Sequence, residues 1–119
     1  MNEMEKKARD NHKMGNNCSN SLAITFADKL GLSNDEAKAL VPQPRSIEGM
    51  CGGYLSVIAM RRKLGIDKEE EYKEMFLKKN GSLYCKELIA SRAGTGRNCN
   101  DIVGESAAMM DEIIKHDER

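Results

Sequence analysis

The stretch "SIEGMCGGYLSVIAMRRKLG", Ser46 to Gly65, combines a helical pattern with glycines that a helix disfavours. Its large residues follow the spacing of one helix face: Ile47, Met50, Cys51, Tyr54, Leu55 and Ile58. Small residues fall on the opposite face: Gly49, Gly52, Gly53 and Ser56. Glycine costs about 1 kcal/mol against alanine inside a helix. We therefore expect a helix to about Leu64 whose small face lets another backbone approach closely. The alternative is that the glycines delay the helix and leave Cys51 in its loop or first turn.

Similar patterns predict helices along the rest of the chain, with capping residues before them or glycine after them. We expect these helices at about 17–30, 35–40 and 67–79, after Ser82, and after Asn98 or Asn100. No segment shows the alternation of a strand. The expected fold class is all-α, a single compact domain of about five to six helices. Residues 1–15 are expected to form a polar N-terminal arm or a frayed helix, and residues 16–119 the four-cysteine all-α domain.

Composition narrows the function. The 19 basic and 19 acidic residues are interleaved, which argues against a nucleic-acid binder and against an electrostatic membrane binder. No apolar run approaches the roughly 20 residues that span a bilayer. The charged start "MNEMEKKARDNHK" lacks the apolar segment of a signal peptide. We therefore expect a cytoplasmic protein. No Ser-His-Asp arrangement or paired-carboxylate site is visible, so the sequence leaves open whether it is an enzyme.

The four cysteines are the candidate functional residues: Cys18, Cys51, Cys85 and Cys99. In a reducing cytosol such a set indicates metal ligation or thiol chemistry. Three of them follow expected helix starts, where unpaired N–H groups and the helix dipole lower a thiol pKa. They also lie on the core side of their helices, so the thiols could meet at one site. They could equally form one disulfide with two bystanders, or only pack as small apolar residues.

Four segments carry a resemblance to a known family. In order they are "GNNC" (15–18), "GMCGGYLS" (49–56), "GSLYCKEL" (81–88) and "RNCNDIV" (97–103). They resemble a family of small bacterial proteins, common in anaerobes, that is described as redox-active and named for the pattern C…GCAxxG…C…C. The resemblance covers about residues 14–114. In place of the family's Cys-Gly-Ala-x-x-Gly this chain has "CGGYLS", and the glycine-rich approach is reduced to Gly49, but the small residues and the cysteine order are kept.

The resemblance implies a small redox-active protein whose four cysteines ligate an iron–sulfur cluster or undergo thiol/disulfide exchange. The expected cofactor is accordingly an iron–sulfur cluster or none. Gly49, Gly52 and Gly53 would allow close approach around Cys51. The absence of Cys-x-x-Cys counts against a thioredoxin-like mechanism. The expected partner is a redox protein that the sequence does not identify, and a homodimer is a further expectation.

Two other functions remain open at this point. The first is a zinc or soft-metal binding protein, although tetrathiolate ligands usually arrive as two closely spaced pairs. Here the nearest cysteines, Cys85 and Cys99, are fourteen positions apart. The second is a helical binding or regulatory module whose cysteines only pack.

Overall fold

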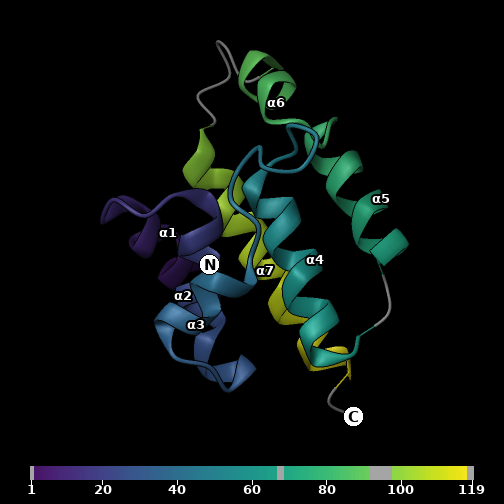
Figure 1. Cartoon of the computed structure of the whole chain (residues 1–119). Helices are drawn as coiled ribbons and strands as arrows, with labels where there is room; N and C mark the ends of the chain where they lie inside the picture. Colours follow the sequence, from purple (N-terminus) through teal and green to yellow (C-terminus); the bar gives the residue numbers. More distant parts are fainter. Residues whose placement is uncertain (1, 67–68, 92–97, 118–119) are drawn as a thin grey trace.

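The computed structural model describes residues 2–66, 69–91 and 98–117. This part of the chain contains seven helices and no strand (Figure 1). They are α1 (Glu3–Lys13), α2 (Cys18–Leu30), α3 (Asn34–Leu40), α4 (Gly52–Leu64), α5 (Glu69–Asn80), α6 (Cys85–Ser91) and α7 (Cys99–Asp117). The all-α prediction is confirmed, with seven helices instead of five or six in one body of 39 × 30 × 30 Å.

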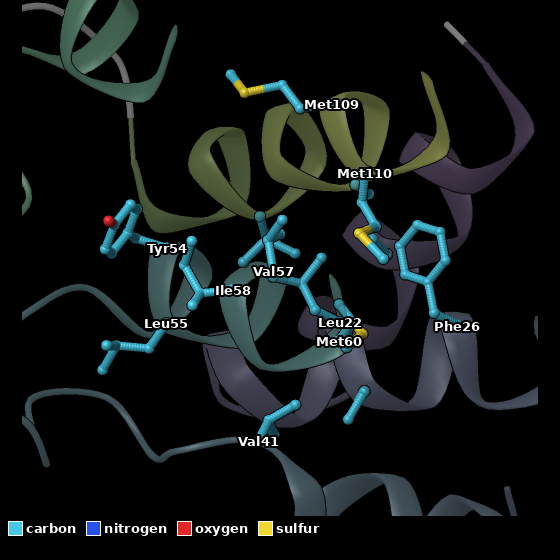
Figure 2. Packing of buried hydrophobic residues seen from close by; sticks show 14 of the residues in the cluster. Leu22, Phe26, Val41, Tyr54, Leu55, Val57, Ile58, Met60, Met109 and Met110 are labelled. Atoms are coloured by element: carbon cyan, nitrogen blue, oxygen red, sulfur yellow. The ribbon is translucent and has the colours of Figure 1, made fainter. Parts of the chain in front are cut away.

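The core lies among α1, α2, α4 and α7, which pack against one another, while α3 lies on α2. Aromatic residues are scarce, so aliphatic and methionine side chains fill much of this space. Figure 2 shows Phe26 of α2 and Met110 of α7 pointing toward one another, and both are fully buried. Val57 and Met60 of α4 are also fully buried. The central position of α4 fixes where its first residue, and thus Cys51, is held.

Helix α4 begins later than its pattern predicts. The expected helix over Ser46 to Leu64 is wrong for its first residues, because the chain turns from Pro44 to Gly49. Arg45, Glu48 and Gly49 have left-handed φ values of 65°, 51° and 76°, which a right-handed helix cannot contain. The glycines therefore delay the helix, as the alternative interpretation proposed. Cys51 becomes the capping residue of α4.

Several other helix ends follow their capping residues, although α6 begins at Cys85 and not directly after Ser82 as expected. Asn17 accepts a hydrogen bond from the N–H of Asn20 at the start of α2. Ser33 and Glu36 form a reciprocal capping box at the start of α3. Gly31 and Gly65 take left-handed conformations after α2 and α4. These ends are where the sequence predicted them.

Residues expected to form a polar arm or a frayed helix form α1, which packs against α2 and α7. Asn2 caps it, and Ala8 is fully buried. Arg9 pairs with Glu5 at 2.9 Å and with Asp101 of α7 at 2.8 Å. Its guanidinium lies over Gly104, where a Cβ would overlap it. Arg9 therefore joins α1 to the first turns of α7.

Two features expected from the sequence fall on residues that the structure does not describe. Residues 92–97, whose sequence "RAGTGR" predicts a loop, lie outside the described residues, as do residues 67–68 at the expected start of α5. Among the helices that the structure describes, none has the length and apolar character needed to cross a membrane.

Candidate functional site

All four cysteines lie at the N-terminal ends of helices. Cys18, Cys85 and Cys99 are the first residues of α2, α6 and α7, and Cys51 caps α4. Backbone N–H groups at these positions lack helical partners, and the helix carries partial positive charge there. The sequence predicted this position for three cysteines. The glycines around Cys51 were the signal that could have identified the fourth.

Backbone hydrogen bonds join the segments that carry Cys51 and Cys85. The N–H of Cys51 donates to the Leu83 carbonyl at 2.7 Å, and the N–H of Cys85 donates to the Gly49 carbonyl at 3.0 Å. Between these bonds, Met50 and Tyr84 form an antiparallel bridge. Each cysteine follows the bridge residue of its own segment. Two helix starts far apart in sequence are thus fixed next to each other.

Gly52 brings the start of α2 against the start of α4. The Ser19 hydroxyl, next in sequence to Cys18, donates to the Gly52 carbonyl at 3.5 Å. A Cβ on Gly52 would lie 2.6 Å from Ser19 Oγ and 2.8 Å from Pro44 Cγ. Any larger residue would push these elements apart. Close approach therefore exists at Gly52.

Gly53 brings the first turns of α7 against the start of α4. A Cβ on Gly53 would lie 3.1 Å from Ser106 Oγ, 3.5 Å from Ile102 Cγ2 and 3.6 Å from Cys51 Sγ. The first turns of α7, which begin at Cys99, therefore lie against α4 beside Cys51. Figure 1 shows α6 and the starts of α4 and α7 toward one end of the molecule.

Gly49 has another role. Its φ is +76°, and a Cβ there would meet nothing within 4 Å. Glycine at this position serves the left-handed turn before Cys51 instead of a close approach.

Hydrogen bonds on both sides fix the start of α7. Asn98 donates its N–H to Asp101 Oδ2 at 2.9 Å, and Asp101 donates its N–H to Asn98 Oδ1 at 3.2 Å. Asn100 Nδ2 donates to the carbonyl of Arg9 in α1 at 2.9 Å. Cys99 is held between these residues, so α1 contributes to its placement.

Neighbouring cysteines affect the pKa values of Cys18 and Cys51. Burial raises the pKa of Cys18, and the charges of Cys51, Cys99 and Cys85 raise it further. A hydrogen bond between Cys18 and Cys99 acts in the same direction. The pKa of Cys51 is also raised by Cys85 and Cys99. Four cysteines from four helices thus share one electrostatic environment.

The expected lowering of thiol pKa values is wrong for Cys18, and the pKa of Cys51, for which no lowering was expected, is raised too. Burial is the main cause of the raised pKa of Cys51, whose side chain is only 4% exposed. The N–H groups of Tyr54 and Gly53 favour the Cys51 thiolate, as a helix start should, but they do not outweigh burial. The sequence identified the helix ends but not the degree of burial that decides the direction of the shift.

The structure records all four cysteines as free thiols. Within residues 2–66, 69–91 and 98–117, no three His, Cys, Asp or Glu side chains are arranged to hold one metal ion. The site is therefore described as four free thiols at the starts of four helices.

Two buried hydroxyls beside this site were missed by sequence reasoning. Ser106 and Tyr72 are fully buried. Ser106 lies four residues after Ile102 and four before Met110, both buried in the core face of α7. That spacing was the available signal for its burial.

Comparison with known proteins gives a family match. The family model described as "Putative redox-active protein (C_GCAxxG_C_C)" matches residues 16–113, which include all four cysteines. Neither the curated proteins nor the solved structures contain a match to this chain.

Proposed function

The chain belongs to the C_GCAxxG_C_C family, described as redox-active, and from this premise we propose that it is an electron-transfer protein. In this proposal Cys18, Cys51, Cys85 and Cys99 together ligate one iron–sulfur cluster. The observation that carries it is the position of these residues at the starts of four helices, with the other cysteines near enough to raise the pKa values of Cys18 and Cys51. Four thiolates are the standard donor set of such clusters.

The helix starts supply the charge balance that a thiolate-ligated cluster needs. Each start offers unpaired N–H groups and partial positive charge toward its cysteine. Beside Cys51, the N–H groups of Gly53 and Tyr54 favour the anionic sulfur. Hydrogen bonds and nearby dipoles of this kind also set the potential of a cluster.

The burial of Cys51 favours ligation over exchange with a protein disulfide. Its side chain is only 4% exposed, so the sulfur of another protein's disulfide reaches it poorly. Iron binding displaces thiol protons and removes the mutual repulsion among the sulfurs. A cluster held by the four cysteines would therefore relieve the part of the raised pKa of Cys18 and Cys51 that comes from the other sulfurs.

We favour a cluster over a single zinc ion. Zinc needs its ligands around one point at about 2.0–2.3 Å. No three ligand side chains in the described part of the chain have that arrangement. Each cysteine of a four-iron cluster binds a different iron atom, so its ligands lie farther apart.

The bound cluster would supply reversible one-electron transfer. The cysteines would hold it, and Gly52 and Gly53 would let the helix starts come close around it. The electron would arrive from one redox protein and leave to another. We also propose a cytoplasmic location, because reducing conditions keep the cysteines available for ligation.

A second candidate is a disulfide between Cys18 and Cys99, favoured by the hydrogen bond between their side chains. The two thiols would lose two protons and two electrons and form one S–S bond. A small disulfide such as oxidised glutathione would accept them and become two thiols.

Anaerobic purification and loading with ferrous iron and sulfide test the proposal. The expected product is coloured, contains iron and sulfide in equal amounts, and bleaches reversibly on reduction. A colourless, iron-free protein with an intact Cys18–Cys99 disulfide after oxidation would replace the first candidate with the second. A colourless protein whose thiols are also redox-silent would overturn both and leave a module whose cysteines only pack.

A further inference from the structure

Two buried hydroxyl groups lie near Cys51 and have no evident structural role. Ser106 of α7 and Tyr72 of α5 are fully buried. Outside this pair, neither hydroxyl has a hydrogen-bond partner in the part of the chain that the structure describes. Leaving a buried donor unsatisfied costs about 1–3 kcal/mol. Their presence therefore points to an acceptor that forms in another state of the site.

The geometry identifies the Cys51 sulfur as that acceptor. Ser106 Oγ and Cys51 Sγ border the same point, at 3.1 Å and 3.6 Å from where a Gly53 side chain would begin. The absent side chain of Gly53 leaves the space between them open. Alanine there would place a methyl group against both the hydroxyl and the sulfur.

Tyr72 stands behind Ser106. Its hydroxyl is close enough for the Ser106 hydroxyl to lower its pKa and for the Cys51 charge to raise it. The ring is held by stacking on Tyr54, with centroids 5.6 Å apart and planes 7° apart, and by a contact with Phe76. A ring fixed in this way fixes the position of its hydroxyl.

A neutral thiol sulfur accepts hydrogen bonds weakly, whereas bonds to charged acceptors are about twice as strong as neutral ones. The Ser106 hydroxyl thus gains most when the sulfur is negative. Fully buried Arg61 also favours negative charge near the Tyr72 hydroxyl.

We propose that the Ser106 hydroxyl, positioned by the Tyr72 hydroxyl, donates a hydrogen bond to the Cys51 sulfur whenever that sulfur carries negative charge. The redox consequence rests on the proposed function. A donor to a ligating sulfur stabilises the reduced, more negative form of the centre and raises its midpoint potential.

The first measurement is the midpoint potential of the iron-loaded protein. Ser106→Ala and Tyr72→Phe should each lower it at unchanged iron content, with the larger shift in Ser106→Ala. Ser56→Ala is the matched control, because Ser56 is another fully buried, unpartnered hydroxyl among the described residues and lies on the helix that Cys51 caps. A potential that moves no more in Ser106→Ala than in Ser56→Ala would overturn the proposal.

The second measurement needs no cluster. In reduced, metal-free protein, methyl methanethiosulfonate modification is followed at each cysteine by mass spectrometry. Losing a hydrogen bond to a charged sulfur should slow modification of Cys51 in Ser106→Ala by about tenfold, with Cys85 unaffected. Alanine favours helix over serine, so the variant should fold. If the protein binds no cluster, the proposed function fails, and the modification rate of Cys51 alone tests the hydrogen bond from Ser106. A Cys51 modification rate that is the same in Ser106→Ala as in the parent protein would overturn the proposal.

Discussion

The backbone N–H of Cys51 donates a 2.7 Å hydrogen bond to the carbonyl oxygen of Leu83. This bond and its counterpart from Cys85 to Gly49 tie the start of α4 to the start of α6. Helix α6 has only seven residues and few neighbours, so the paired segments determine where Cys85 lies. The turn that presents the Gly49 carbonyl is therefore part of the site.

That turn gives the first prediction. Gly49→Ala forces a left-handed conformation on a residue with a Cβ, which costs about 1–2 kcal/mol. We expect this loss in urea unfolding, together with reduced iron loading because Cys85 loses its anchor. Gly65→Ala is a matched control: its φ of +75° and open surroundings are the same, but it lies at the other end of α4. It should lose similar stability and keep full loading. Equal loading in both variants would contradict the role of the turn.

The close contacts of α4 give the second prediction. Gly52→Ala places a methyl group 2.8 Å from the rigid ring of Pro44, and overpacking of this kind costs about 1–3 kcal/mol. Gly53→Ala makes milder contacts, from 3.1 Å upward, and gains about 1 kcal/mol of helix propensity. Thermal unfolding should therefore show a larger loss for Gly52→Ala. The reverse order would refute the packing described at Gly52.

Helix α1 gives the third prediction. Arg9→Met removes two partly buried ion pairs and should destabilise the protein by about 1–2 kcal/mol. Lys6→Met, in the same helix, removes only the exposed pair with Asp10 and should change nothing measurable. Denaturant midpoints of both variants provide the comparison. If Arg9→Met were as stable as Lys6→Met, α1 would not be anchoring α7.

The raised pKa of Cys18 gives the fourth prediction, for reduced, metal-free protein. As pH rises past the ordinary thiol pKa of about 8.5, the unfolded chain releases this proton first. The free energy of unfolding should therefore fall above that pH, because the folded pKa is higher. Urea unfolding at pH 8 and pH 10 measures the loss. Cys18→Ser should lose less than the parent protein, and equal losses would show that the thiol is not buried among other thiols.

Local signals in the sequence predicted much of the fold. Asn17 and Gly31 bound α2, and Ser33 begins α3, because capping depends on a few neighbouring residues. The late start of α4 was predicted only as the alternative interpretation, since Arg45 and Glu48 are residue types that rarely take left-handed conformations.

The site was predictable only in part. Helix starts identified the position of three cysteines, and the family resemblance identified all four. Their positions depend on long-range contacts, which are the isolated bridge of Met50 with Tyr84, which has no strand pattern, and the close approaches at Gly52 and Gly53. The pair of Arg9 with Asp101 joins residues from opposite ends of the chain. Burial, which raises the pKa of Cys51, follows from such long-range contacts and not from local sequence.

The central claim is that four cysteines form one redox centre, and iron bound per chain in four single Cys→Ala variants tests it most directly. After identical anaerobic loading, replacement of Cys18, Cys51, Cys85 or Cys99 should each reduce bound iron and sulfide to a similarly low level, while Ser56→Ala retains the parent content. Retention of full iron content by any of the four cysteine variants would contradict the account.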